Sequence, residues 1–246
     1  MQRVRLRYAK RGRLRFTSHR DIGRAMERAL RRARVPMALS SGFNPHPRIS
    51  YAGAAPTGAA SEAEYLELGL AQTCDPADLR GSLDAALPAG LDVVDAVTAG
   101  PGSLADRLQA SHWELRLPGA DPDAAAAAAT AFLAAPAVEV RRMTKKGLRT
   151  FDARGPVVAL AGPDADHQIE ASRSRLPGCA ILGLVVRHAE PSVRPDDVLA
   201  GLREIAGFQT SAAPLVRRLA QGPLDPQTGT VGDPLAPDRD TFSPPG

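Results

Sequence analysis

The strongest constraint on the fold is a strict alternation of arginine and apolar residues at the start of the chain. Residues 3–8 read Arg-Val-Arg-Leu-Arg-Tyr, so the apolar side chains share one face and the arginines the other. A period of two is typical of a β-strand that buries one face. The alternation therefore predicts a strand with one basic face. The arginines of that face are Arg3, Arg5 and Arg7.

An amphipathic helix is predicted next. Residues 13–16 alternate once more, and Ser18 with Asp21 resembles the capping pair that starts a helix. Apolar residues at helical spacing then predict a helix over residues 18–34. Arginines three or four residues apart line its other side, where their like charges repel one another unless an anion lies along the face. These arginines are Arg20, Arg24, Arg28, Arg31 and Arg32.

The rest of the first half predicts further strands at 35–40, 64–70 and 91–97, with a helix that begins at Asp75 before the last of them. Pro45 and Pro47 stiffen the turn at 42–47, and alternation resumes at Ile49 and Tyr51. The order βαββαβ predicts an α+β protein with a ferredoxin-like first half, in which four antiparallel strands carry two helices on one side.

The second half repeats a similar order less clearly, and its strands near 157–174 fit the simple plan poorly. From Gly222 onward Pro, Gly and Asp dominate, and no periodic apolar face remains. We therefore expect a ferredoxin-like domain at 1–102, a second α+β domain at 103–221 and a disordered tail at 222–246. In the second domain, strands are expected at 112–117, 137–143, 157–161, 167–174 and 181–187, and helices at 121–135 and 195–206.

Composition excludes several classes of protein. With 43% hydrophobic and 24% charged residues, no apolar run of membrane-spanning length and no leader-like start, the chain is expected to be cytoplasmic and without a membrane partner. Cys74 and Cys179 are too few for a thiolate zinc site or an iron–sulfur cluster. We therefore predict neither a metal site nor a cofactor.

Charge is strongly polarised along the chain. The net charge is +4, but residues 1–50 hold 14 Lys and Arg against two acidic residues. Such one-ended basicity is expected of a protein that binds a polyanion, and RNA is the predicted partner. A solvated basic face and an arginine-rich codon bias are the alternatives. A second basic cluster follows in mid-chain. It consists of Arg141, Arg142, Lys145, Lys146, Arg149 and Arg154.

The rigid turn at 42–47 carries side chains suited to touching a base, because aromatic rings next to arginines stack on unpaired bases. Phe43 is considered equally for stacking and for the core, whereas Phe16 is expected in the core. The predicted nucleic-acid contacts are Arg3, Arg5, Arg7, Arg15, Arg20, Arg24, Arg28, Arg31, Phe43, Asn44, His46, Lys145 and Lys146.

His19 and His46 offer an alternative, because two imidazoles can move protons near neutral pH in a metal-independent endoribonuclease. The simpler interpretation is that His19 bonds to a nearby carbonyl and His46 stiffens its turn. No nucleophile elbow and no phosphate-binding loop is present. The sequence therefore favours a binding protein over an enzyme.

Three segments resemble the radical SAM-linked protein family, whose domains are fused to or encoded beside radical SAM enzymes. They are residues 12–21 (GRLRFTSHRD), 42–47 (GFNPHP) and 61–65 (SEAEY), with later matches at 145–147, 151–154 and 192–199. The resemblance covers about residues 2–210 and departs from the family pattern at Gly155. It implies a radical SAM enzyme as partner, and this chain has no cysteine triplet for such chemistry.

Two functions besides the endoribonuclease follow. The first is an RNA-binding accessory protein that works with a radical SAM enzyme or with RNA-processing machinery. The second is an adaptor that docks a radical SAM enzyme without touching RNA.

Overall fold

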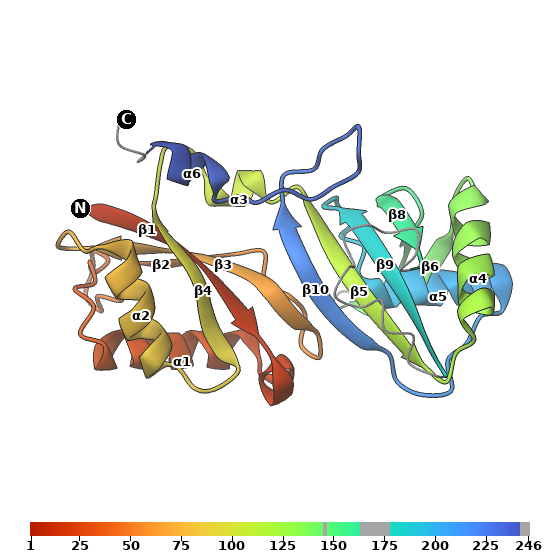
Figure 1. Ribbon diagram of the computed structural model, residues 1–246, viewed down its shortest axis with the longest axis horizontal. Coiled ribbons are helices and arrows are strands. Elements are labelled where there is room, and N and C mark those ends of the chain that lie inside the picture. Colours follow the sequence, from red (N-terminus) through yellow and green to blue (C-terminus); the bar gives the residue numbers. More distant parts are fainter. Residues whose placement is uncertain (145–146, 163–177, 242–246) are drawn as a thin grey trace. The chain divides into compact units, whose positions relative to one another are not determined.

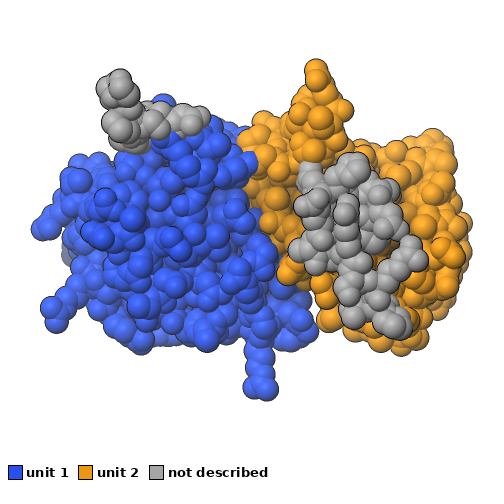
Figure 2. Space-filling model, in the orientation of Figure 1, with its two compact units in different colours: residues 1–108, 233–246 blue, residues 109–232 orange. Residues whose placement is uncertain are grey.

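The computed structural model describes residues 1–144, 147–162 and 178–241. The chain divides into two compact units, one made of Met1–Leu108 with Asp233–Gly246 and the other of Gln109–Gly232 (Figure 2). Each unit combines an antiparallel sheet with helices, so the predicted α+β class is confirmed.

In the first unit, two helices cover one face of an antiparallel sheet (Figure 1). The strands lie in the order β4-β1-β3-β2. With α1 and α2 between them, they follow the βαββαβ order that the sequence predicts. The elements of this unit are β1 (Gln2–Lys10), the short 3-10 helix η1 (Gly12–Phe16), α1 (His19–Arg32), β2 (Ile49–Ala52), β3 (Ala60–Leu70), α2 (Pro76–Ala86), β4 (Leu91–Thr98), α3 (Leu104–Arg107) and α6 (Ala236–Thr241).

Two local predictions are corrected. Residues 35–40 form no strand, because Pro36 has no N–H to donate and only isolated bridges occur, at Met37 and Leu39. The second strand of the sheet is β2 instead, at the place where alternation resumes after the rigid turn. Residues 13–16 form η1 rather than an extended segment, and Thr17 N–H closes its last turn on Leu14 O.

The main core lies between the sheet and the two helices. Val4 and Leu6 of β1 are fully buried against Ile22 and Met26 of α1, and Leu79 of α2 joins the same cluster. The apolar faces that periodicity assigns to β1 and α1 are therefore the faces that pack together.

The C-terminal segment differs from the predicted disordered tail as far as residue 241. Leu224 pairs with Val231 in a bridge, and α6 follows. Leu235 is fully buried with Tyr65, Val97 and other residues on the sheet face opposite α1. Periodicity gives no signal here, because one buried leucine and one buried carboxylate, Asp238, hold the segment.

The second unit has the same spatial order of strands, β10-β5-β9-β8. A hairpin of β6 and β7 is inserted between α4 and β8, which explains the surplus of predicted strands. The predicted strand at 167–174 lies outside the described residues. The elements are β5 (Ala110–Pro118), α4 (Pro122–Ala134), β6 (Glu139–Thr144), β7 (Gly147–Asp152), β8 (Val157–Ala161), β9 (Cys179–Arg187), α5 (Pro195–Ala206) and β10 (Leu215–Gly222).

Helices α4 and α5 pack closely in this unit because of one glycine. A Cβ at Gly201 of α5 would lie 2.6 Å from Phe132 Cε2 of α4. β7 and β10 were not predicted from the sequence. Both carry polar and exposed side chains among their apolar ones, so their alternation is weak.

Candidate nucleic-acid interface

Helix α1 starts at the capping pair that the sequence predicts. Asp21 N–H donates to Ser18 Oγ at 3.2 Å, and Ser18 Oγ donates to the Asp21 carboxylate at 2.7 Å. This cap fixes where the helix begins and therefore which residues face the core. Ile22 and Met26 turn inward, so the arginines turn toward solvent.

The arginines on the outer side of α1 are exposed. Arg24 lies 3.5 Å from Asp21, and both of these side chains are 56% exposed, so the pair is weak. Within the described residues, Arg20, Arg28 and Arg31 have no acidic partner. The row therefore presents guanidinium groups whose donors are available to an external anion.

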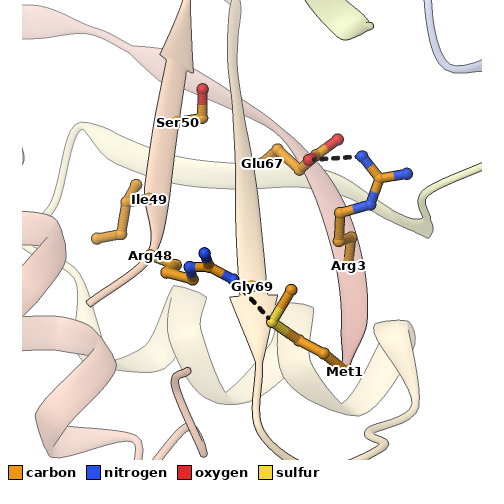
Figure 3. Close-up of a pocket in the computed structure, with 7 residues that line it drawn as sticks. All are labelled: Met1, Arg3, Arg48, Ile49, Ser50, Glu67 and Gly69. Atoms are coloured by element: carbon orange, nitrogen blue, oxygen red, sulfur yellow. Dashed lines mark hydrogen bonds and ion pairs between the residues drawn. The ribbon is translucent and has the colours of Figure 1, made fainter. Parts of the chain in front are cut away.

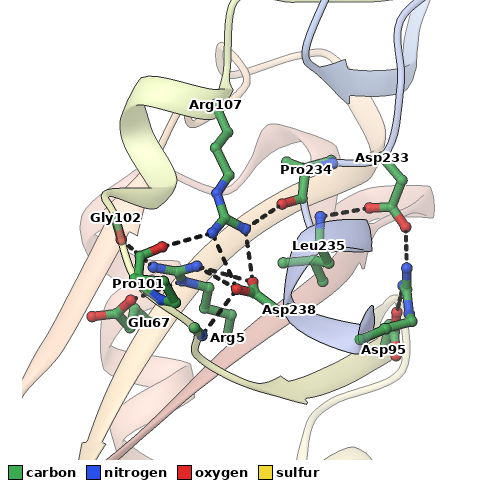
Figure 4. Close-up of polar contacts among 12 residues, drawn as sticks. Arg5, Glu67, Asp95, Pro101, Gly102, Arg107, Asp233, Pro234, Leu235 and Asp238 are labelled. Atoms are coloured by element: carbon green, nitrogen blue, oxygen red, sulfur yellow. Dashed lines mark hydrogen bonds and ion pairs between the residues drawn. The ribbon is translucent and has the colours of Figure 1, made fainter. Parts of the chain in front are cut away.

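Arg5 in β1 has the opposite environment and leaves the predicted interface. Its side chain is 0% exposed, with Nε 2.9 Å from Glu67 and Nη1 2.8 Å from Asp238 (Figure 4). It also donates to Gly102 O. A phosphate cannot reach a guanidinium whose donors are buried and bound. The sequence could not reveal this, because the decisive carboxylate stands 233 residues away.

The other arginines of β1 are also bound within the unit. Arg3 Nη1 lies 3.2 Å from Glu67, although its side chain remains 46% exposed. Arg7 Nε donates to Glu62 O at 2.8 Å. At the end of the strand, Arg11 pairs with Glu62 and Asp92, and the Glu62 hydrogen bond raises the pKa of Arg11. Arg5 and Arg7 are therefore bound within the unit, whereas Arg3 is paired with Glu67 but remains partly exposed.

Asp238 is the centre of this internal network. Burial by itself raises the pKa of a carboxylate, but hydrogen bonds from Arg107, Arg5 and Gly100 N–H outweigh it and lower the pKa of Asp238. Figure 4 shows both guanidinium groups directed at this carboxylate. The segment that carries α6 is thus attached to the sheet by charge as well as by Leu235.

The 42–47 turn is closed at its base and open at its tip. Ser40 N–H donates to His46 O at 2.8 Å, and His46 N–H donates to Ser40 Oγ at 3.0 Å. Phe43 is fully exposed, and the side chains of Asn44 and His46 also face solvent. The turn is rigid while its three candidate contact residues remain accessible.

Phe16 is not a core residue, which corrects the prediction. It is 61% exposed, and the Arg15 guanidinium lies 4.6 Å above its ring. An exposed aromatic ring covered by an arginine is a platform on which a base can stack.

The two histidines show no joint arrangement. The exposed ring of His19 meets the edge of Tyr51, with centroids 5.0 Å apart, and no described hydrogen bond links it to His46. Burial raises the pKa of Tyr51, whose hydroxyl has no partner among the described residues. This tyrosine was not singled out from the sequence as a polar group, and no sequence signal distinguishes it.

In the second basic cluster too, some side chains are bound internally and others are exposed. Arg142 pairs with the buried Asp197 and lies over the Phe151 ring, and Arg154 donates to two backbone carbonyls. Arg141 and Arg149 are exposed on the β6–β7 hairpin. Lys145 and Lys146 lie outside the described residues.

A family model matches residues 3–195, which is most of the chain. The chain belongs to the DUF2344 family. That family is described as uncharacterized proteins conserved in bacteria, a description that names neither an activity nor a partner. No curated protein matches this DUF2344 chain.

Two further observations concern the described residues of this family member. None of their helices is long and apolar enough to cross a membrane. No group of three or more His, Cys, Asp or Glu side chains gathers there in a way that could bind a metal ion.

Proposed function

We propose that this DUF2344 protein binds RNA through the exposed arginines of α1, together with the tip of the 42–47 turn. The observation that carries the proposal is the lack of described acidic partners around Arg20, Arg28 and Arg31. The arginines of β1 are bound within the unit, whereas these three arginines of α1 have no described acidic partner. Guanidinium forks bind phosphate oxygens in pairs, and an anion along the row relieves its self-repulsion.

The spacing of the row supports a polyanion rather than a small anion. Arg20 and Arg31 are eleven residues apart, or about 16 Å along a helix axis. Over that length one nucleic-acid strand carries several phosphates. The exposed rings of Phe16 and Phe43 favour RNA with unpaired bases, because stacking needs bases that are free of a duplex.

The proposed role is that of an accessory protein, which presents RNA to another enzyme. A radical SAM enzyme is the partner that the family resemblance implies, and it belongs to this proposal. The endoribonuclease alternative requires His19 and His46 to act on one phosphodiester, and no described contact links them. The adaptor alternative needs no RNA at all.

Salt dependence of RNA binding tests the proposal. Single-stranded RNA should bind at low salt, with affinity falling steeply as salt rises. Replacing Arg20, Arg28 and Arg31 together by Ala should reduce the slope of log affinity against log salt by about two, since each single-strand phosphate contact contributes about 0.7. Arg203→Ala, an exposed arginine on α5, is the matched control and should leave the slope unchanged.

The outcomes separate the three functions. Absence of RNA binding at low salt, or an RNA affinity that does not change with salt concentration, overturns the RNA proposal and favours the adaptor. Cleavage of the bound RNA by the wild-type protein, lost in a His19→Ala, His46→Ala double variant, favours the endoribonuclease.

A further inference from the structure

An open cavity of about 310 Å³ lies on the sheet of the first unit (Figure 3). Its lining includes Arg3 of β1, Gly69 and Glu67 of β3, and Ser50 of β2. Arg3 projects from the face of β1 opposite Val4, which packs against α1 and α2. The cavity is therefore on the other side of the sheet from the arginine row of α1.

Gly69 makes room for the cavity. It pairs with Arg3 across β1, and on its other side its N–H donates to Arg48 O at 2.9 Å. A Cβ at Gly69 would lie 3.0 Å from Arg48 Cβ, which is closer than ordinary contact. Gly69 thus lies between two arginines, Arg3 of β1 and Arg48, which immediately precedes β2.

Positive charges outnumber negative charges in the lining of the cavity. Arg3 and Arg48 line the cavity with a single carboxylate, Glu67. That carboxylate is shared with the buried Arg5, so it neutralises only part of the charge at the opening. Arg48 is exposed, and its described side-chain partner is the thioether of Met1, a weak acceptor. The cavity has an excess of positive charge.

The hydrogen-bond donors that line the cavity come from three different positions. Ser50 Oγ has no hydrogen-bond partner among the described residues and lines the same cavity. Arg3, Arg48 and Ser50 therefore supply donors from three positions along the lining of one cavity. Figure 3 shows Arg3 beside Glu67 and Arg48 beside Met1 and Gly69. A phosphate monoester has three terminal oxygens and negative charge, which three such donors can share.

We propose that this cavity binds the terminal phosphate of a phosphate monoester. The monoester can be a free nucleotide or the phosphorylated end of an oligonucleotide, because both present the same group. The site is independent of the RNA-binding proposal, since it uses none of the α1 arginines.

Isothermal titration calorimetry of the full chain tests the site with adenosine 5′-monophosphate, inorganic phosphate and adenosine. The first two should bind and adenosine should not. Arg48→Ala should weaken binding about tenfold, the expected loss of one charged hydrogen bond, and Arg48→Lys should restore part of it. Arg203→Ala, at an exposed arginine of α5 that belongs to neither proposed site, is the control and should bind as the wild type does. Affinity should also fall between pH 7.5 and 5, because the second phosphate pKa is about 6.

Two oligonucleotides then distinguish a free nucleotide from a strand end as the source of the phosphate. A 5′-phosphorylated oligonucleotide that outcompetes adenosine 5′-monophosphate, while its 5′-hydroxyl form does not, identifies a strand end as the ligand. Failure of both oligonucleotides to compete identifies the small monoester, whereas equal competition by the two overturns the proposal, because the 5′-hydroxyl strand has no terminal phosphate. Failure of both phosphate probes to bind the wild type, or equal weakening by Arg203→Ala and Arg48→Ala, overturns the proposal. Loss of salt-dependent RNA binding alone would leave it standing.

Discussion

The arginines of β1 and those of α1 differ in environment, although both recur at regular intervals in the same basic half of the chain. In β1, Arg5 is fully buried between Glu67 and Asp238, and Arg7 donates to Glu62 O. Arg11, which follows the strand, pairs with the Glu62 carboxylate. In α1, Arg28 and its neighbours face solvent. A periodic arginine pattern therefore predicts a shared face, but not whether that face meets solvent.

The physical reason is the number of neighbours that each element has. β1 lies between β3 and β4, and the C-terminal segment covers the sheet face that carries Arg5. Carboxylates on those neighbours reach the strand from both sides. Helix α1 lies on the outside of the unit and buries only one stripe, so the opposite stripe has no neighbour to supply acceptors.

The largest effect is expected at Arg5. Arg5→Ala leaves the buried Asp238 with only Arg107 and the partly exposed Glu67 with only Arg3. Breaking a buried pair costs about 3–5 kcal/mol. Arg28→Ala on α1 should change stability by less than about 0.5 kcal/mol, as exposed substitutions do. Urea denaturation followed by circular dichroism measures both. Equal midpoints for the two variants would show that the pairing in β1 contributes nothing.

The next effect is expected at Asp238, whose pKa is lowered from its usual 3.8 by Arg107 and Arg5. A carboxylate with a depressed folded-state pKa stabilises the fold above pH 3.8 and loses that contribution as pH falls through the depressed value. Asp238→Asn should cost about 1–3 kcal/mol near pH 7 and less in acid, because charged hydrogen bonds are lost. A stability difference that stays constant down to low pH would contradict the network.

A smaller effect is expected at the tip of the turn. Asn44→Ala and His46→Ala should leave the melting temperature within about 4 °C, because surface substitutions change stability little. Each should weaken RNA binding several-fold if the tip touches a base. If either variant unfolds while its folded fraction binds normally, the turn has only an architectural role. Thermal melts measure the stability of each variant, and filter binding measures its affinity for RNA.

The smallest effect is expected at Arg24. Its pair with Asp21 spans 3.5 Å between side chains that are both 56% exposed, and such pairs contribute about 0.2–1 kcal/mol at most. Arg24→Ala should therefore shift the urea midpoint very little while still lowering RNA affinity. A stability loss for Arg24→Ala as large as that for Arg5→Ala would contradict the distinction between the bound arginines of β1 and the exposed arginines of α1.

The local elements and the sides they bury can be predicted from residues that are close in sequence. Alternation located β1, the Ser18–Asp21 pair located the start of α1, and α5 lies where helical spacing placed it, at 195–206. The sequence also identified the arginine row of α1 and the rigid turn. These features depend on residues a few positions apart, whose periodicity and capping act within one element.

Which basic side chains remain available to a ligand depends instead on contacts between residues that are distant in sequence. Asp238 lies 233 residues from Arg5, and Gly69 becomes a cavity floor only because β3 pairs with β1 and contacts Arg48 on its other side. Phe16 was expected in the core, but it lies exposed in η1. Strand pairing and the return of the C-terminal segment bring distant residues into contact, and the periodicity within a single element does not predict those contacts.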